Sequence, residues 1–252
     1  MFDYTPYEGS PRSAEEAKLQ CVIANRILAN EGVLDGYGHV SVRNPETRST
    51  FFQARAVAPE FVLPEDILEI DSAGDVLSDT ELKPYGERAI HASVLKARPD
   101  VSAVVHGHPH EIIALSVLGR EFRSLAQFCG MFYEPLPYFD DYSAGSGMLI
   151  TSLDDGEKLA SALGKAPGVI MRGHGCTVTG GSTQQAVMNT IFLRDNTRMQ
   201  LMAMPLGEPR YLTEEEGRGS EKTQYSAISL GRCWDYWISR AKKAMPDLSD
   251  II

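Results

Sequence analysis

The stretch LKPYGERAIHASVLKARPDVSAVVHGHPH, residues 82–110, decides how the rest of the chain is interpreted. Ile90, Val94 and Leu95 recur with a helical period, which predicts a helix from Glu87 to Ala97. Arg98-Pro99 ends this helix, and the apolar run that follows has the character of a buried strand. Because the helix runs back along the sheet and the strand returns, Glu87 at the helix start can face the end of the strand.

Three of the six histidines, His106, His108 and His110, occupy alternate positions at the end of that strand. Side chains alternate between the faces of a strand, so His106 and His108 point the same way, and Gly107 leaves room opposite. An isolated His-X-His pair is usually two surface histidines. The interior character of this strand favours a metal ion, because buried imidazoles are poorly solvated unless something coordinates them. Pro109 suits the first turn of a helix, so His110 faces the substrate rather than the metal in this interpretation.

His174 follows a second apolar strand and stands between two glycines in IMRGHGCTV, residues 170–178. A lone histidine between glycines is more often a turn residue, but beside a His-X-His pair it is a candidate third ligand. Three histidines with an open position are typical of a catalytic metal site. Glu87 is the candidate carboxylate, although an acid at a helix start is favourable without any other role. His91 lies four residues later on the same helical face.

Helices and strands alternate along the chain, but hairpins connect several strands, which predicts a mixed sheet with helices on both faces. An acidic loop is expected after Pro205. The predicted helices are residues 14–31, 87–97, 110–118, 153–164, 183–204 and 225–244, and the predicted strands are residues 39–43, 50–54, a hairpin within 65–77, 101–108 and two strands within 168–180.

Length and composition narrow the classes of protein. The 252 residues contain no internal repeat, and we treat residues 1–252 as one domain. The formal net charge of −10 without a basic cluster argues against nucleic acid and anionic membrane surfaces as partners. No apolar stretch approaches the roughly 20 residues that a membrane span requires. The start lacks the pattern of a secretory signal, and scattered Cys21, Cys129, Cys176 and Cys233 are typical of reduced thiols, so we expect a cytoplasmic protein.

Three segments together resemble the class II aldolase/adducin family: GHVSVRNPE (residues 38–46), the stretch quoted first, and VIMRGHGCTVTGGS (residues 169–182). The resemblance covers roughly residues 16–207. It implies a three-layer α/β/α sandwich around a mixed, largely antiparallel sheet, and a homotetramer with active sites between subunits. His106, His108 and His174 match the histidine ligands of one divalent metal ion per chain. Glu87 matches the acidic residue that completes the metal shell or acts as general acid/base.

The chain departs from the sugar-phosphate members of this family at three places where small polar groups cradle phosphate. It has Gly38-His39, QARAVAPEFV (residues 53–62) and Tyr85-Gly86 there. Arg55 suits a planar carboxylate, and His39 and Tyr85 suit a flat hydroxylated ring. This pattern is similar to the family's decarboxylases of hydroxylated aromatic or pyridine carboxylic acids. The resemblance therefore implies a metal-dependent carbon–carbon lyase of a small carboxylic acid, in which Glu87 or a pocket histidine such as His110 supplies the proton.

Two alternatives remain at this stage. One is an aldolase or epimerase acting on a sugar-type hydroxy-carbonyl compound, and the other is a non-catalytic scaffold like the adducin members, against which the intact ligand set argues. Three imidazoles and a carboxylate suit zinc or manganese, with iron and cobalt also possible. Residues 205–252 contain Trp234, Tyr236 and Trp237, a pattern typical of a core or a subunit interface. Tyr225 or Tyr236 could line a neighbouring subunit's site.

Overall fold

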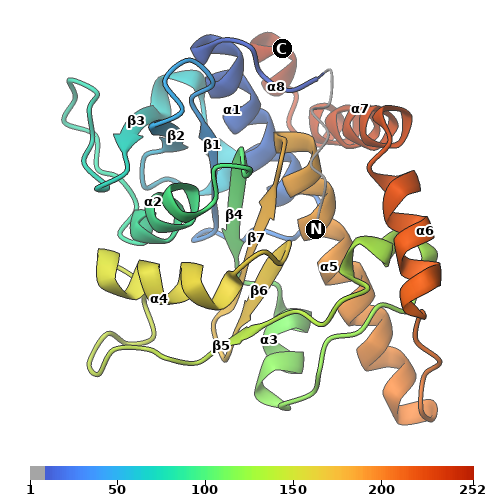
Figure 1. Cartoon of the computed structure of the whole chain (residues 1–252). Helices are drawn as coiled ribbons and strands as arrows, with labels where there is room; N and C mark the ends of the chain where they lie inside the picture. Colours follow the sequence, from blue (N-terminus) through green and yellow to red (C-terminus); the bar gives the residue numbers. More distant parts are fainter. Residues whose placement is uncertain (1–8) are drawn as a thin grey trace.

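A seven-stranded sheet runs through residues 9–252, the part of the chain that this computed structural model describes (Figure 1). Its order is β3-β2-β1-β4-β7-β6-β5, and every neighbouring pair is antiparallel except β5 and β6. The strands are β1 His39–Arg43, β2 Thr50–Ala54, β3 Ile67–Asp71, β4 Ala103–Gly107, β5 Tyr138–Phe139, β6 Gly168–Met171 and β7 Gly175–Gly180. The expected mixed, largely antiparallel sheet is confirmed.

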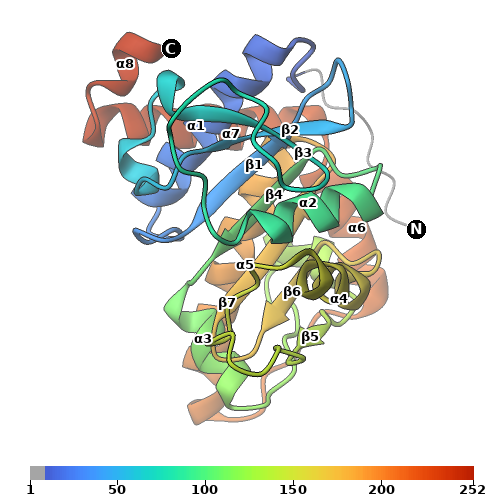
Figure 2. The ribbon, with the colours of Figure 1, turned by 90° about the vertical axis from the view of Figure 1, so that its left-hand side faces the viewer.

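Helices cover both faces of the sheet and enclose a hydrophobic core on each side. Helices α2 and α4 lie over a core that includes Ile90 and Leu159 (Figure 2). Helices α1, α3, α5 and α7 contribute to the opposite core, which includes Ile27 and Ile191. The helices are α1 Ala14–Asn30, α2 Arg88–Ala97, α3 His110–Val117, α4 Leu153–Leu163, α5 Thr183–Ala203, α6 Glu214–Gln224, α7 Ala227–Ala244 and α8 Leu248–Ile251, with short 3₁₀ turns at Pro59–Phe61, Pro64–Asp66, Gln127–Phe132 and Met204–Leu206. This is the three-layer sandwich that the sequence predicts.

Strand alternation decides which polar side chains lie beneath α2. Val105 of β4 and Val40 of β1 belong to the core under α1 and α5, whereas Val104 belongs to the core under α2. Successive side chains point to opposite faces, so His106 and His39 turn toward α2. The two histidines are also paired across the β1–β4 ladder. The central strands therefore place imidazoles side by side on the α2 face.

Two sequence-based predictions of elements are wrong. The segment predicted as an acidic loop contains α6, because Thr213 and Glu216 form a reciprocal capping box that stabilises a helix start despite two glycines. The helix expected from about residue 225 agrees with the structure to within two residues, since it begins at Ala227 after the N-cap Ser226. The predicted hairpin after β3 also keeps only a single bridge, between Ile70 and Val76, in place of a second strand.

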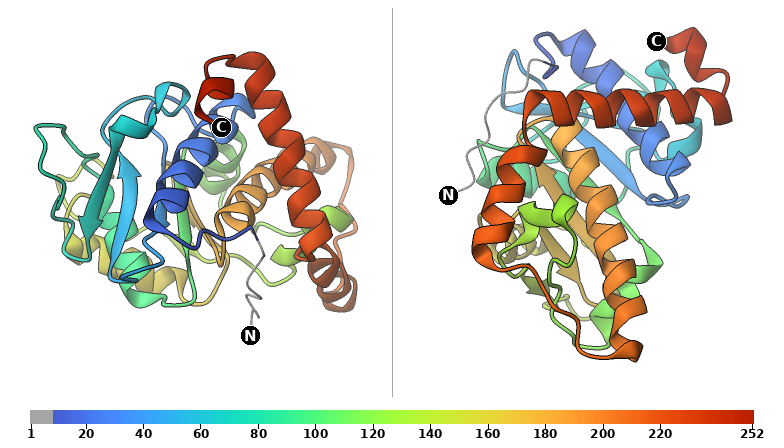
Figure 3. Two further views of the ribbon diagram at one scale, coloured as in Figure 1. Left: turned by 90° about the horizontal axis from the view of Figure 1, so that it is seen from above. Right: turned by 90° about the vertical axis from the view of Figure 1, so that its right-hand side faces the viewer.

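The C-terminal segment packs on its own chain. Helix α7 contacts α1 and α5 (Figure 3). Trp234 and Trp237 are 8% and 5% exposed and belong to the core, whereas Tyr236 is 57% exposed. The Tyr225 hydroxyl donates to Asn189 Oδ1 at 2.9 Å within the same chain. The tryptophans are therefore core residues, and a role of Tyr236 or Tyr225 at a neighbouring subunit stays a prediction.

None of the helices in residues 9–252 is long and apolar enough to cross a membrane. Residues 1–8, on which the expected lack of a secretory signal partly rests, lie outside the described part of the chain. The four cysteines are free, and three of them are buried. Burial raises the pKa of the Cys21 and Cys176 thiols to about 12, so both are protonated packing residues.

Candidate metal centre

The close approach of β4 and β7 brings two histidine segments together. Gly107 at the end of β4 pairs with Cys176 of β7, one residue after Gly175. A Cβ atom on Gly175 would lie 2.2 Å from the Gly107 carbonyl oxygen, so this position requires glycine. The turn between β6 and β7 carries His174, with Gly173 in the left-handed region at φ +65°. His174 consequently faces the end of β4, where His106 and His108 lie.

Glu87, His106, His108 and His174 form one cluster, in which the four candidate ligand atoms all lie within 4.8 Å of one another. His106 Nε2 is 3.1 Å from His108 Nε2. Glu87 Oε2 lies 3.5 Å from His106 Nε2 and 3.7 Å from His174 Nε2. The His106 side chain is fully buried, and the other three are between 8% and 14% exposed. The cluster thus has a sheltered base and a partly open side.

Neighbouring groups hold the outward-facing atoms of His106, His108 and Glu87. His108 Nδ1 contacts Asp35 Oδ1 at 3.1 Å, and His106 Nδ1 contacts Thr177 Oγ1 at 3.3 Å. Glu87 Oε1 accepts the backbone N–H of Ile150 at 2.9 Å. A partner on the far nitrogen of an imidazole fixes the tautomer and directs the other lone pair inward. The arrangement is therefore organised for ligation by Nε2.

Electrostatics favour the protonation states that bind a cation. Burial opposes ionisation of Glu87, but its hydrogen bond and charge interaction with His106 dominate and lower the pKa of Glu87 to about 2. Burial, with His106 nearby, lowers the pKa of His174 to about 4. Burial also lowers the pKa of His108, against the opposing effect of Asp35. At neutral pH Glu87 is therefore a carboxylate, and His108 and His174 are neutral imidazoles. Together with His106 they form a donor set that fits a divalent metal ion.

The residues expected to contact substrate occupy different surroundings. His39 is buried, with its ring 5.2 Å from the His106 ring and 4.4 Å from the Tyr85 ring, centroid to centroid. The Tyr85 hydroxyl donates to the Val57 carbonyl, so this phenol is occupied by the protein. The aromatic ring of Tyr85, rather than its hydroxyl, is what packs beside His39.

Arg55 and His110 lie outside the four-residue cluster. Arg55 Nε donates to Asp66 Oδ1 at 2.6 Å, and the Arg55 side chain is 36% exposed. This ion pair orients the guanidinium and leaves its terminal nitrogens without a partner among the described residues. His110 is exposed at the first residue of α3. Contact of either residue with substrate stays a prediction.

Sequence reasoning missed several partners of these residues. Asp35, Thr177 and Ser41 have no motif of their own, and their contacts depend on strand register and loop conformation. His91 was recognised only as a neighbour of Glu87 on the helix. Its partners, His39 and Ser41, lie about 50 residues earlier in the chain. Only the alternation that turns His39 and Ser41 toward α2 could have indicated this contact.

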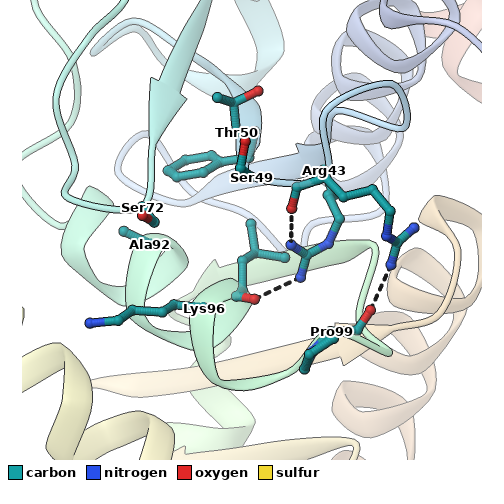
Figure 4. A pocket seen from close by; sticks show the side chains of 10 residues that line it. Arg43, Ser49, Thr50, Ser72, Ala92, Lys96 and Pro99 are labelled. Atoms are coloured by element: carbon teal, nitrogen blue, oxygen red, sulfur yellow. Dashed lines mark hydrogen bonds between the residues drawn. The ribbon is translucent and has the colours of Figure 1, made fainter.

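A separate cavity of about 280 Å³ lies between the β1–β2 region and the end of α2 (Figure 4). Arg43 lines it, but the Arg43 guanidinium donates to the carbonyls of Arg48, Leu95, Val101 and Arg98. Arg48 in turn donates to the Pro99 carbonyl. These arginines hold the carbonyls beyond the end of α2, so their placement has a structural explanation that is independent of the metal centre.

Comparison with known proteins agrees with this geometry. The family described as the class II aldolase and adducin N-terminal domain matches residues 20–201. The chain belongs to this family. The resemblance drawn from the sequence is thereby confirmed.

Several relatives are named as decarboxylases. Decarboxylase tropJ of Talaromyces stipitatus is 31% identical, with 84% of this chain and 89% of the relative covered. The 3,4-dihydroxyphthalate decarboxylase of a Terrabacter species is 32% identical, with 86% and 93% covered. Among solved structures, L-fuculose 1-phosphate aldolase from Glaciozyma antarctica matches with a TM-score of 0.79 at 23% identity, covering 97% of this chain and 96% of that one. The structural match shows the shared fold.

Proposed function

We propose that this chain is a divalent-metal-dependent decarboxylase of a hydroxylated aromatic carboxylic acid. The observation that carries the proposal is the convergence of Glu87 and three histidines within 4.8 Å. It occurs in a chain whose relatives at about one-third identity over most of their length are named decarboxylases. The departures from the sugar-phosphate pattern at His39, Arg55 and Tyr85 point the same way.

His106, His108 and His174 would hold the metal ion, with Glu87 as the fourth ligand. The ion supplies a Lewis acid that stabilises negative charge on the substrate oxygens as the bond between the ring carbon and the carboxylate breaks. Carbon dioxide leaves, and the ring carbon takes a proton. Despite burial, contact with His106 lowers the pKa of Glu87 to about 2, which keeps the side chain ionised, as a metal ligand requires. A histidine of the pocket, with His110 on α3 as our candidate, supplies the proton.

Arg55 is our candidate for binding a carboxylate of the substrate. Its Nε atom donates to Asp66, which is 5% exposed, so this buried carboxylate fixes the orientation of the guanidinium. Two terminal nitrogens in a fixed plane can bind a carboxylate in a bidentate manner. The ring of Tyr85, which is tilted by 45° against the His39 ring, would flank the aromatic ring of the substrate.

The first test combines elemental analysis with an assay for CO2. We expect about one metal ion per chain in the purified protein, and CO2 release from some member of a panel of hydroxylated aromatic and pyridine carboxylic acids that includes 3,4-dihydroxyphthalate. The double variant His106→Ala/His108→Ala should lose both the metal and the activity. The variant His110→Gln tests the proton donor, because it should retain metal while CO2 release slows.

Other outcomes identify the alternatives. Metal without CO2 release, together with cleavage of hydroxy-carbonyl compounds, would favour an aldolase or epimerase. Protein without stoichiometric metal, and a Glu87→Gln variant indistinguishable from the original, would favour a non-catalytic scaffold.

We also propose zinc or manganese as the ion, since three imidazoles and a carboxylate suit both, and iron or cobalt as the next candidates. We further propose that the protein forms a homotetramer and that it is located in the cytoplasm. Gel filtration with light scattering tests the tetramer, and metal analysis after expression in defined medium tests the ion.

A further inference from the structure

A second group of imidazoles lies beside the candidate metal centre, outside the four candidate ligands. His91 of α2 is fully buried, and both of its ring nitrogens are engaged. Its Nδ1 lies 2.6 Å from Ser41 Oγ, and its Nε2 lies 2.7 Å from His39 Nδ1. The result is a continuous chain of hydrogen bonds, from Ser41 through His91 to His39, that ends beside the metal ligand His106.

Both imidazoles of this hydrogen-bonded chain are buried, and neither has a carboxylate among its hydrogen-bond partners in the described residues, which favours the neutral form of each ring. Burial, with His106 nearby, lowers the pKa of His91 to about 3. Burial and the neighbouring histidines, His91 first among them, hold the pKa of His39 well below its usual range. A neutral imidazole carries one N–H and one lone pair, so each ring donates through one nitrogen and accepts through the other.

The contact between Ser41 and His91 decides which atom donates in each of these hydrogen bonds. Ser41 is fully buried, and His91 is the hydrogen-bond partner that its hydroxyl has among the described residues. If His91 donated to Ser41, the serine proton would have no acceptor, which is unfavourable for a buried hydroxyl. Ser41 therefore donates to His91 Nδ1, and His91 carries its own proton on Nε2.

The contacts at the other end agree with this assignment. With its proton on Nε2, His91 donates to His39 Nδ1. The Gln53 amide nitrogen also approaches His39 Nδ1, at 3.4 Å. Two donors directed at one nitrogen require that this nitrogen accepts, so the proton of His39 is on Nε2. This N–H has no hydrogen-bond partner among the described residues.

We propose that His91 is a positioning residue that holds His39 as the Nε2-protonated tautomer, so that His39 donates a hydrogen bond to an anionic oxygen of the substrate at the metal centre. The substrate class rests on the proposed function, whereas the tautomer does not. His39 is paired with His106 across the β1–β4 ladder, and its ring centroid lies 5.2 Å from that of His106, one of the residues that would hold the metal ion. A fixed donor at this point selects an oxygen acceptor over an amine or a methyl group.

The experiment uses the full-length protein labelled with ¹⁵N-histidine. Multiple-bond ¹⁵N–¹H spectra report the tautomer of each imidazole, and His39→Gln assigns the His39 signals. We expect Nε2-protonated His39 in the original protein and a mixture of tautomers in His91→Phe. The variant His91→Gln restores an amide donor toward His39 and should recover the single tautomer. Ser41→Ala, which removes only the terminal hydroxyl, provides the test should His91→Phe fail to fold.

Steady-state measurements test the contact with substrate. We expect kcat/KM to fall about tenfold in His91→Phe, the loss typical of a hydrogen bond to a charged group, while metal content stays at the original value. His91→Gln should recover most of this loss. A purely structural role would lower folded protein and metal content together and would not be rescued by glutamine.

The two proposals fail in different ways. If no acid of the panel releases CO2, the proposed function fails, while the spectra of His39 still test the inference about His91. Binding of 3,4-dihydroxybenzoate should then shift the His39 Nε2 signal. An original protein with His39 protonated on Nδ1, or an unchanged tautomer and unchanged kcat/KM in His91→Phe, would overturn the inference.

Discussion

At the scale of single residues, Asp35 positions the candidate metal ligand His108. Its Oδ1 atom accepts the backbone N–H groups of Tyr37 and Gly38 at 3.0 Å and contacts His108 Nδ1. The loop therefore holds the carboxylate, and the carboxylate holds the imidazole. A carboxylate on the outer nitrogen also increases the basicity of the inner one.

Asp35→Asn should keep the loop contacts but remove the charge, and we expect metal affinity to fall about 10- to 100-fold. Competition with a chromogenic chelator measures this directly. Asp79→Asn, which alters an exposed carboxylate outside the cluster, serves as the matched control. Equal affinities of the two variants would show that Asp35 does not support the metal site.

Some contacts of the candidate centre could be predicted from the sequence, and others could not. His106, His108 and His174 could be predicted to meet, because strand alternation and flanking glycines are local signals. Asp35 and His91 could not be assigned partners, since each contact joins segments whose separation in space depends on loop conformation or on the packing of a helix against a distant strand.

At the scale of elements, the β4–β7 pair is the part of the fold that the site depends on most. Gly175→Ala would place a Cβ atom 2.2 Å from the Gly107 carbonyl oxygen. The strands must separate, and we expect a loss of about 1–3 kcal/mol in the free energy of unfolding together with reduced metal content. Urea denaturation and elemental analysis measure the two effects.

The control for this change is Gly219→Ala. Gly219 lies in α6, and a Cβ atom there would meet nothing within 4 Å. We expect this substitution to stabilise the protein by about 0.5–1 kcal/mol, because alanine loses less conformational freedom in a helix than glycine does. If Gly175→Ala behaved like this control, the close approach of β4 and β7 would not be required for the site.

Most elements were predictable because their signals are local. The bounds of β1 and β2 agree with prediction, and Ser13 and Ser182 cap α1 and α5 as expected. Helix α6 was missed because its charged residues lack an apolar periodicity, and its capping box was the remaining signal. The two-residue strand β5 was missed because it is ordered by pairing with β6, a contact that no local pattern encodes.

At the scale of the whole molecule, the C-terminal helix α7 contributes to the core of its own chain. Trp237 packs against Phe192 of α5 in an edge-to-face arrangement, with ring centroids 5.9 Å apart. Trp237→Ala should lower the free energy of unfolding by about 3–5 kcal/mol, as expected for a buried aromatic residue. Tyr236→Ala, at the adjacent exposed position, should change it by less than about 0.5 kcal/mol.

Chemical denaturation at low protein concentration measures both changes. Equal and small effects would contradict the packing of α7 on α1 and α5. A Tyr236→Ala variant that keeps its stability but changes its elution volume in gel filtration would support the prediction that this tyrosine lies at a subunit interface.

The order of strands in the sheet has a consequence for how this family can diversify. The three histidines of the cluster come from the ends of β4 and β7 at the centre, whereas His39, Arg55 and Tyr85 come from β1, the end of β2 and the segment before α2. Under the proposed function, a substitution in the second group changes which substrate binds, whereas the first group holds the metal ion. Substrate preference and the cleavage step can therefore change independently of each other during evolution.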